Sequence, residues 1–136
     1  MPGRASASRP PSKVIGSLRL HFHLPCEIRF EGTLASAMVQ NEFKHHLADM
    51  HDRIIADGCR VITADVQGLQ FVDSSAIRLF VDWISRATYK YKIIFLIDPG
   101  TTWQRLSFSV LQSMAPDSVE VREGGSVPVS KDEPTT

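Results

Sequence analysis

The chain has 136 residues, of which 43% are apolar and 22% charged, so it is long and apolar enough for one globular domain with its own core. Its formal net charge is zero, which argues against nucleic-acid binding, since that function needs a concentration of basic residues on one face. No stretch reaches the length of a membrane-spanning helix and no apolar signal core opens the chain, so we expect a cytoplasmic protein that recognises other proteins.

The first predicted elements are a flexible arm and a pair of strands. Residues 1–13 are rich in proline and serine and carry too little apolar surface to order themselves. From Leu18 apolar and polar residues alternate, which predicts a half-buried strand that Pro25 ends. Residues 26–30 alternate in the same way, and the two strands together predict an antiparallel hairpin with one solvated face.

Two pairs of residues near the predicted strands could bind a metal or form a disulfide. His21 and His23 share one strand face, but a metal site needs three or four convergent ligands. A solvated face is the simpler interpretation, so the sequence predicts no metal and no cofactor. Cys26 and Cys59 fall at predicted strand starts without the spacing of a disulfide framework, so we expect reduced, half-buried thiols, with a disulfide as the alternative.

A helix and a short strand follow. Ser36 is placed to cap the helix and Gly58 to end it. One face of this helix carries an apolar stripe: Val39, Phe43, Leu47, Met50 and Ile54. Residues 61–66 are apolar and β-branched and lie between two glycines, which predicts a strand, and residues 69–72 form a second short apolar segment. The helix between two strands predicts a right-handed crossover connection.

The last part of the chain predicts two more helices and two strands. The helix after Asp73 has a core-facing stripe: Ile77, Phe80, Val81, Ile84 and Thr88. Residues 93–97 are continuously apolar, as in a strand placed centrally in a sheet. Thr101 or Thr102 is expected to cap a third helix, which Pro116 ends, and a short strand is expected over residues 119–121. This helix has a stripe expected to face the core, with Phe108 and Leu111 widening it: Trp103, Leu106, Val110 and Met114.

This order of elements predicts the fold class. Strands and helices alternate after an initial hairpin, which indicates an α/β domain with a mixed sheet of four or five strands and three to four helices. The expected domain covers residues 14–122. Residues 123–136 are rich in Gly, Pro, Ser and Thr and predict a flexible tail.

Asp73, Ser74 and Ser75 stand where the second helix begins. The first turn of a helix has unpaired N–H groups and a partial positive charge, so an Asp or Ser caps it and an anion is favoured there. A phosphoryl group on one of these serines would add about −1.5 to −2 charges and change the surface that a partner meets. The simpler alternative is that both serines only cap the helix.

Residues 61–80 resemble the signature of the STAS domain in the form found in bacterial anti-sigma factor antagonists. The shared pattern is an apolar strand, a turn with a glycine, an apolar pair, then Asp73-Ser74-Ser75-Ala76-Ile77 and a helix. The resemblance extends over residues 17–121 and implies a STAS-like fold. In that family the serine directly after the aspartate is phosphorylated by a partner kinase that is also the anti-sigma factor.

The resemblance makes Ser74 the phosphoacceptor and Asp73 its flanking acid. The family's usual glycine after the serines is Ala76 here, and the position after Gly32 that is often acidic in the family is Thr33. It implies that the unphosphorylated protein binds an anti-sigma serine kinase of the histidine-kinase-like ATPase class, and that a PP2C-type phosphatase resets it. The residues expected to contact the partner are Asp73, Ser75, Ala76, Ile77, Arg78 and Trp83. For Trp83 the alternative is packing on a neighbouring helix.

Three other functions remain as alternatives. The first is a STAS scaffold subunit of a stress-sensing assembly, and the second is a STAS module that binds a small ligand, although no Gly-rich phosphate loop follows a strand. The third is a hydrolase with Ser74 as nucleophile. The G-x-S-x-G spacing is missing, and Asp73 as the immediate neighbour is badly placed to orient a histidine, so the sequence predicts no enzyme. The oligomeric state does not follow from the sequence.

Overall fold

The computed structural model describes residues 12–23 and 26–124, and within them six strands form one sheet that three helices cover. The strands are β1 (Ser12–Ile15), β2 (Leu18–His23), β3 (Glu27–Leu34), β4 (Val61–Val72), β5 (Lys92–Ile97) and β6 (Val119–Glu123). The helices are α2 (Ala37–Ala56), α3 (Ser74–Ala87) and α4 (Thr102–Met114). The predicted mixed α/β fold class is confirmed, with more strands than expected.

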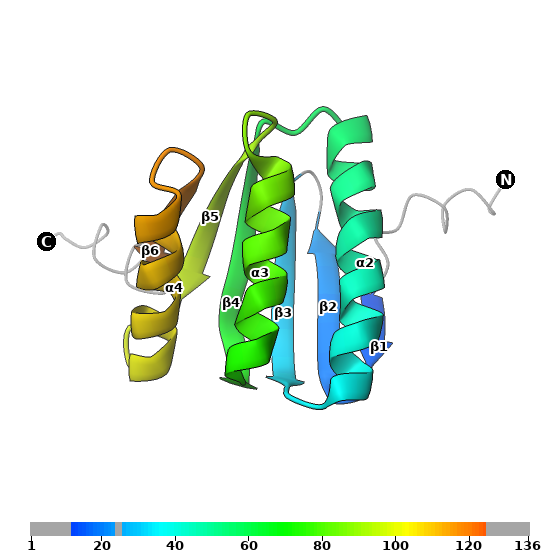
Figure 1. Ribbon diagram of the computed structural model, residues 1–136, viewed down its shortest axis with the longest axis vertical. Helices are drawn as coiled ribbons and strands as arrows, with labels where there is room; N and C mark the ends of the chain where they lie inside the picture. Colours follow the sequence, from blue (N-terminus) through cyan, green and yellow to red (C-terminus); the bar gives the residue numbers. More distant parts are fainter. Residues whose placement is uncertain (1–11, 24–25, 125–136) are drawn as a thin grey trace, which may run out of the picture.

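The sheet has the order β1-β2-β3-β4-β5-β6 (Figure 1). β1, β2 and β3 are antiparallel, which confirms the predicted hairpin of β2 and β3, whereas β3, β4, β5 and β6 are parallel. The parallel pairs place the carboxyl ends of β3 and β4 at the same edge of the sheet. β5 lies inside the sheet, between β4 and β6.

β1 is a strand that the sequence did not predict. It begins at Ser12, within the stretch assigned to an N-terminal arm, and turns into β2 through Gly16, whose φ of 61° favours glycine. Four residues are too few for a periodic pattern to stand out. The rest of the expected arm, residues 1–11, and the tail from residue 125 lie outside the described residues.

All three helices lie over the same face of the sheet (Figure 1). A cluster of aromatic rings joins them, with centroids 4.9 to 6.3 Å apart: Phe30 of β3, Phe43 of α2, Phe80 and Trp83 of α3, Phe95 of β5 and Phe108 of α4. The opposite face carries charged residues and ion pairs, such as Arg29 with Asp65 at 3.7 Å, beside a few apolar side chains. The core therefore lies between one sheet face and the helix layer.

The predicted cap, end and apolar stripe of α2 are confirmed, whereas Thr101 stands at the N-cap of α4 without a side-chain cap hydrogen bond. The amide of Val39 donates to the Ser36 hydroxyl at 3.1 Å, and Gly58 follows α2 with a φ of 74°. Phe43, Leu47, Met50 and Ile54 are buried, and Val39 packs at the edge of the core: the amphipathic pattern located both the helix and its buried face.

β4 is longer than the sequence predicted. It runs through Gly68 as one strand of 12 residues, with irregular register opposite β3. A Cβ at Gly68 would lie 3.1 Å from the carbonyl oxygen of Phe30, so glycine permits this close approach of the two strands. Gly68, predicted to mark the end of a strand, lies within β4, between two shifts of its register.

The core face of α4 was predicted correctly only in part. Leu106, Val110 and Met114, expected in the core, are 63%, 57% and 60% exposed. Phe108 and Leu111, expected to widen the stripe, are buried as predicted, and Gln104 completes the core face. A polar residue occupies the core because its amide bonds backbone groups of β4, and this condition is invisible in the pattern of apolar residues.

The prediction of reduced thiols is also wrong, because Cys26 and Cys59 form a disulfide. Cys26 directly precedes β3, and its carbonyl oxygen accepts a hydrogen bond from the amide of Thr63 in β4. Two residues that precede adjacent parallel strands are thereby side by side, with their Cα atoms 6.2 Å apart.

Trp83 and Tyr91, both buried, and the half-buried His51 form a hydrogen-bonded chain. The indole N–H of Trp83 donates to the Tyr91 hydroxyl at 2.8 Å, and that hydroxyl lies 2.8 Å from Nδ1 of His51. The indole can only donate, so the Tyr91 oxygen accepts from Trp83 and its other hydrogen bond is with the imidazole of His51. Burial raises the pKa of Tyr91 to about 12, and burial, aided by Lys90, lowers the pKa of His51.

We therefore expect acid to destabilise the protein through His51. Its folded pKa is below its unfolded value, so the stability it contributes is present above about pH 6.5 and is lost as the pH falls through the folded pKa. Urea unfolding at pH 7.5 and pH 5, compared with the same measurement on His51→Gln, isolates this part of the pH dependence. Equal pH dependence in the two proteins would contradict it.

Candidate functional site

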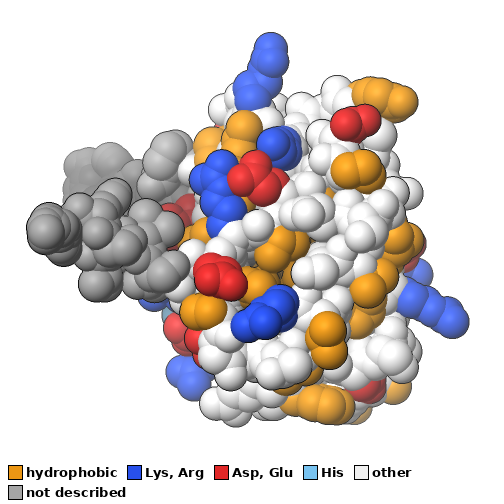
Figure 2. Space-filling model, turned by 90° about the vertical axis from the view of Figure 1, so that its left-hand side faces the viewer, with side chains coloured by type: hydrophobic (Ala, Val, Ile, Leu, Met, Phe, Trp, Pro, Cys, Tyr) orange, Lys and Arg blue, Asp and Glu red, His pale blue; other side chains and the backbone are white. Residues whose placement is uncertain are grey.

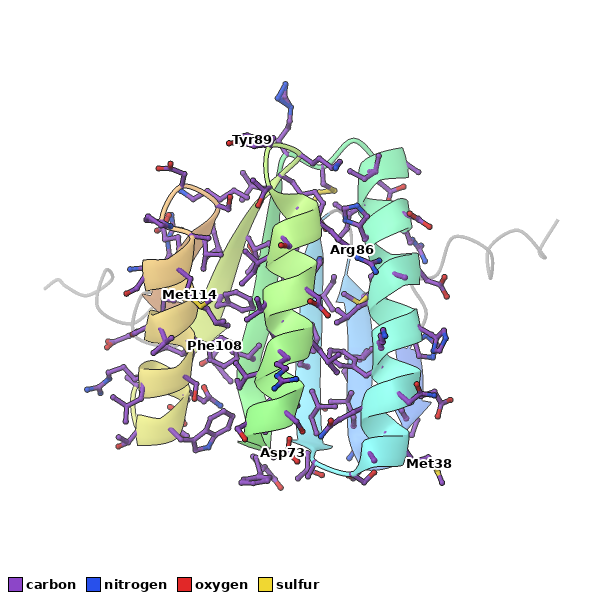
Figure 3. The ribbon with its side chains drawn as sticks, viewed as in Figure 1. Met38, Asp73, Arg86, Tyr89, Phe108 and Met114 are labelled. Carbon is purple, nitrogen blue, oxygen red and sulfur yellow. A yellow bond between two sulfur atoms is a disulfide. The ribbon has the colours of Figure 1, made fainter. Side chains whose placement is uncertain are left out.

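The candidate site lies at the edge where β3 and β4 end and α3 begins. The amide of Asp73 donates to the carbonyl oxygen of Leu34, which anchors the end of β4 to the end of β3. Asp73 is then the N-cap of α3, with an extended backbone, and its Oδ1 accepts the amide of Ala76 at 3.0 Å. Figure 3 shows Asp73 at the same end of the molecule as Met38, where α2 begins.

A second helix contributes to this cap. The Gln40 amide of α2 donates to Asp73 Oδ1 at 2.9 Å and to the carbonyl oxygen of Ala35 at 3.1 Å. The Ser75 hydroxyl lies 2.8 Å from the same carboxylate oxygen and 3.1 Å from Gln40 Oε1. The Ser75 bond first, then the backbone amide of Ala76 and the Gln40 amide, lowers the pKa of Asp73, so its carboxylate is ionised at neutral pH.

The two serines have different surroundings. Ser74 is the first residue of α3 and is exposed, and among the described residues its hydroxyl has no hydrogen-bonding partner. The Ser75 hydroxyl is held between Asp73 and Gln40. A protein that modifies this helix start would therefore meet the Ser74 hydroxyl free and the Ser75 hydroxyl engaged.

The predicted partner-binding residues divide into exposed and buried ones. Arg78 is exposed one turn after Ser74, and Ile77 is half-buried. Ala76 and Trp83 are buried, with 0% and 1% of their surface exposed, so neither side chain contributes to an exposed partner surface, and this part of the prediction is wrong. Because α3 has a wide apolar face, the sequence did not show whether Trp83 faces a partner or the core. In the structure its indole N–H donates to the buried Tyr91 hydroxyl, so the ring lies in the core.

Sequence reasoning missed two residues here. Gln40 lies 33 positions before Asp73, and no local pattern links the two. Met38, 79% exposed in the first turn of α2, is at the same end of the molecule but outside the periodic stripe of that helix. Both residues can be assigned to the site only from the fold, because the crossover from β3 to β4 brings the starts of α2 and α3 together.

Ser74 offers a free hydroxyl beside the ionised carboxylate of Asp73, and within residues 12–23 and 26–124 no base is bonded to it.

His21, which the sequence analysis weighed as a metal ligand, pairs with Glu31 at 3.2 Å. In the described part of the chain no three His, Cys, Asp or Glu side chains gather as a metal site would require. Nor is any of the described helices long and apolar enough to cross a bilayer.

This fold, with a capped helix start after a parallel strand, is STAS-like. The structure is similar to the crystal structure of an anti-sigma factor antagonist from Mycobacterium paratuberculosis, with a TM-score of 0.54 over 76% of this chain and 83% of that chain. The two sequences are 10% identical, so the similarity concerns the fold. No protein-family model matches the sequence, and a search of curated proteins gives no match.

Proposed function

We propose that this protein is an anti-sigma factor antagonist controlled by phosphorylation of Ser74. In the unphosphorylated form it binds an anti-sigma serine kinase of the histidine-kinase-like ATPase class through the start of α3, and phosphorylation releases that kinase. A PP2C-type phosphatase restores the binding form, and the protein itself acts by binding and not as an enzyme. The observation that supports this most is the exposed, unbonded hydroxyl of Ser74 at a helix start in a STAS-like fold.

Electrostatics provide the reason for release. A phosphoryl group on Ser74 adds about −1.5 to −2 charges beside the Asp73 carboxylate, which is already ionised. The unpaired N–H groups at the start of α3 stabilise this charge locally. Arg78, exposed one turn away and without an ion pair among the described residues, then faces the phosphate in place of an acidic partner surface.

We expect Ser74→Asp to weaken kinase binding at least about tenfold, whereas Ser74→Ala keeps the binding and cannot be phosphorylated. The first measurement is phosphosite mapping by mass spectrometry on protein from its native host, with and without phosphatase treatment. A phosphate on Ser74 identifies the acceptor. Affinities for the kinase, measured by calorimetry, then compare the two variants with the unmodified protein.

Ser109→Asp is the matched control, because Ser109 is an exposed serine of α4 outside the site and receives the same added charge. It should bind the kinase as the unmodified protein does. Two results would reject the proposal: no phosphate on Ser74 under growth or stress, or equal kinase affinities for Ser74→Asp and Ser74→Ala.

A further inference from the structure

The outer side of α4 carries an apolar stripe that the rest of residues 12–23 and 26–124 leaves exposed. Leu106, Val110 and Met114 follow one another at four-residue intervals and are more than half exposed, and Trp103 begins the stripe, half-buried. Figure 2 views the molecule from the side where α4 and β6 lie and shows hydrophobic side chains gathered on that side. A monomeric protein rarely exposes a contiguous apolar row of this length.

The stripe continues into a groove. A cavity of about 200 Å³ separates α4 from α3, and Val81 and Thr88 line it on one side and Met114 on the other. α2 and α3 pack directly against each other, whereas α4 has its main contacts with β5 and β6. The apolar surface therefore runs from the exposed side of α4 to the side of α3.

The charges on α4 help to decide whether this surface binds a different protein or a second copy of the chain. Arg105 is the charged residue of α4, and it lies on the side away from the stripe, where its guanidinium donates to the carbonyl oxygen of Pro99 at 2.9 Å. Ser109 and Ser113 are small, uncharged neighbours on the exposed surface. A surface evolved for a different protein normally offers charges that steer and select that partner. A two-fold contact brings each residue near its own copy, so an uncharged stripe suits self-association.

We propose that α4 is the contact between two copies of this chain, which pair antiparallel about a two-fold axis. In that arrangement Val110 of one copy meets Leu106 of the other, and Trp103 of one copy approaches Met114 of the other. A helix of 13 residues is about 20 Å long, so the buried surface is at the small end of specific interfaces, and the dimer is weak and reversible. This inference does not depend on Ser74.

Sedimentation equilibrium on the full chain tests the proposal. Between about 10 μM and about 1 mM, the range for a small interface, we expect concentration-dependent dimerisation. The double variant Leu106→Glu/Val110→Glu places carboxylates against each other at the two-fold axis and should raise the Kd at least about 30-fold. The matched control, Asn41→Glu/His45→Glu, adds two carboxylates to exposed positions of α2, away from α4, and should keep the Kd of the unmodified protein.

Two outcomes overturn the inference. One is a protein that stays monomeric over the whole range, as it would if the stripe served a different protein. The other is equal dimerisation of the two double variants, which would place the contact elsewhere. If Leu106→Glu/Val110→Glu fails to fold by circular dichroism, a photo-reactive benzoylphenylalanine at position 106 replaces it. A cross-link to the peptide that contains Val110 of a second copy supports the pairing, and its absence overturns it.

Discussion

Replacing Gln104 with leucine will lower the free energy of unfolding by about 3–5 kcal/mol, because each buried polar group left unpaired costs about 1–3 kcal/mol. Gln104 is 0% exposed. Its side-chain N–H groups donate to the carbonyl oxygens of Val66 and Leu69, both at 2.9 Å, and its Oε1 accepts the amide of Asp98 at 2.8 Å. Leucine has a similar size but satisfies none of these groups.

The effect should reach the candidate site. Val66 and Leu69 flank the irregular part of β4, and that strand leads directly to Asp73. Without the Gln104 hydrogen bonds the irregular backbone of β4 is less well ordered. We therefore expect faster hydrogen exchange of the backbone amides between residues 67 and 73, measured by mass spectrometry, in addition to a lower urea midpoint.

Gln112→Leu is the matched control on the same helix. Gln112 accepts one bond, from the amide of Val121 at 2.6 Å, and is half-buried, so its loss should cost only about 1 kcal/mol. If Gln104→Leu is no more destabilising than Gln112→Leu, the hydrogen bonds of Gln104 do not support β4 as the geometry indicates.

The fold class could be predicted from the sequence because its signals are local. Alternation located β2 and β3, and the amphipathic stripe, the Ser36 cap and Gly58 located α2. Each of these signals depends on residues within a few positions of one another.

The errors came from conditions set by distant parts of the chain. The face of α4 depends on carbonyl oxygens in β4, some 35 residues earlier, which need the Gln104 amide. Trp83 is buried, and its indole N–H donates to the Tyr91 hydroxyl, which lies beyond the end of α3. A pattern of apolar residues gives the width of a helix face, but it does not say which side of a wide face packs inward.

The candidate site was predictable in position but not in detail. Asp73, Ser74 and Ser75 are adjacent, and a helix start follows from the change of period after them. The difference between the two serines depends on Gln40, which the crossover helix brings beside Asp73. The sequence alone therefore left Ser74 and Ser75 equivalent, except through the family resemblance.

Removing the disulfide will lower the free energy of unfolding by about 4 kcal/mol, the chain-entropy value for a loop of this length. Cys26 and Cys59 are 33 residues apart, and the loop they close contains β3 and all of α2. The double variant Cys26→Ala/Cys59→Ala, unfolded in urea without reductant, measures the loss. Alanine fits the half-buried position of Cys26 and the 9% exposed position of Cys59 without adding a polar group.

Reductant provides the control for this prediction. Dithiothreitol should lower the urea midpoint of the unmodified protein toward that of the double variant, and it should leave the double variant unchanged. A titration of free thiols that finds two in the folded, unreduced protein would contradict the bond directly. Because disulfides persist in oxidising compartments and are reduced in the cytosol, the stability of this protein should follow the thiol redox state around it. The helix most affected is α2, whose Gln40 holds the Asp73 carboxylate at the start of α3.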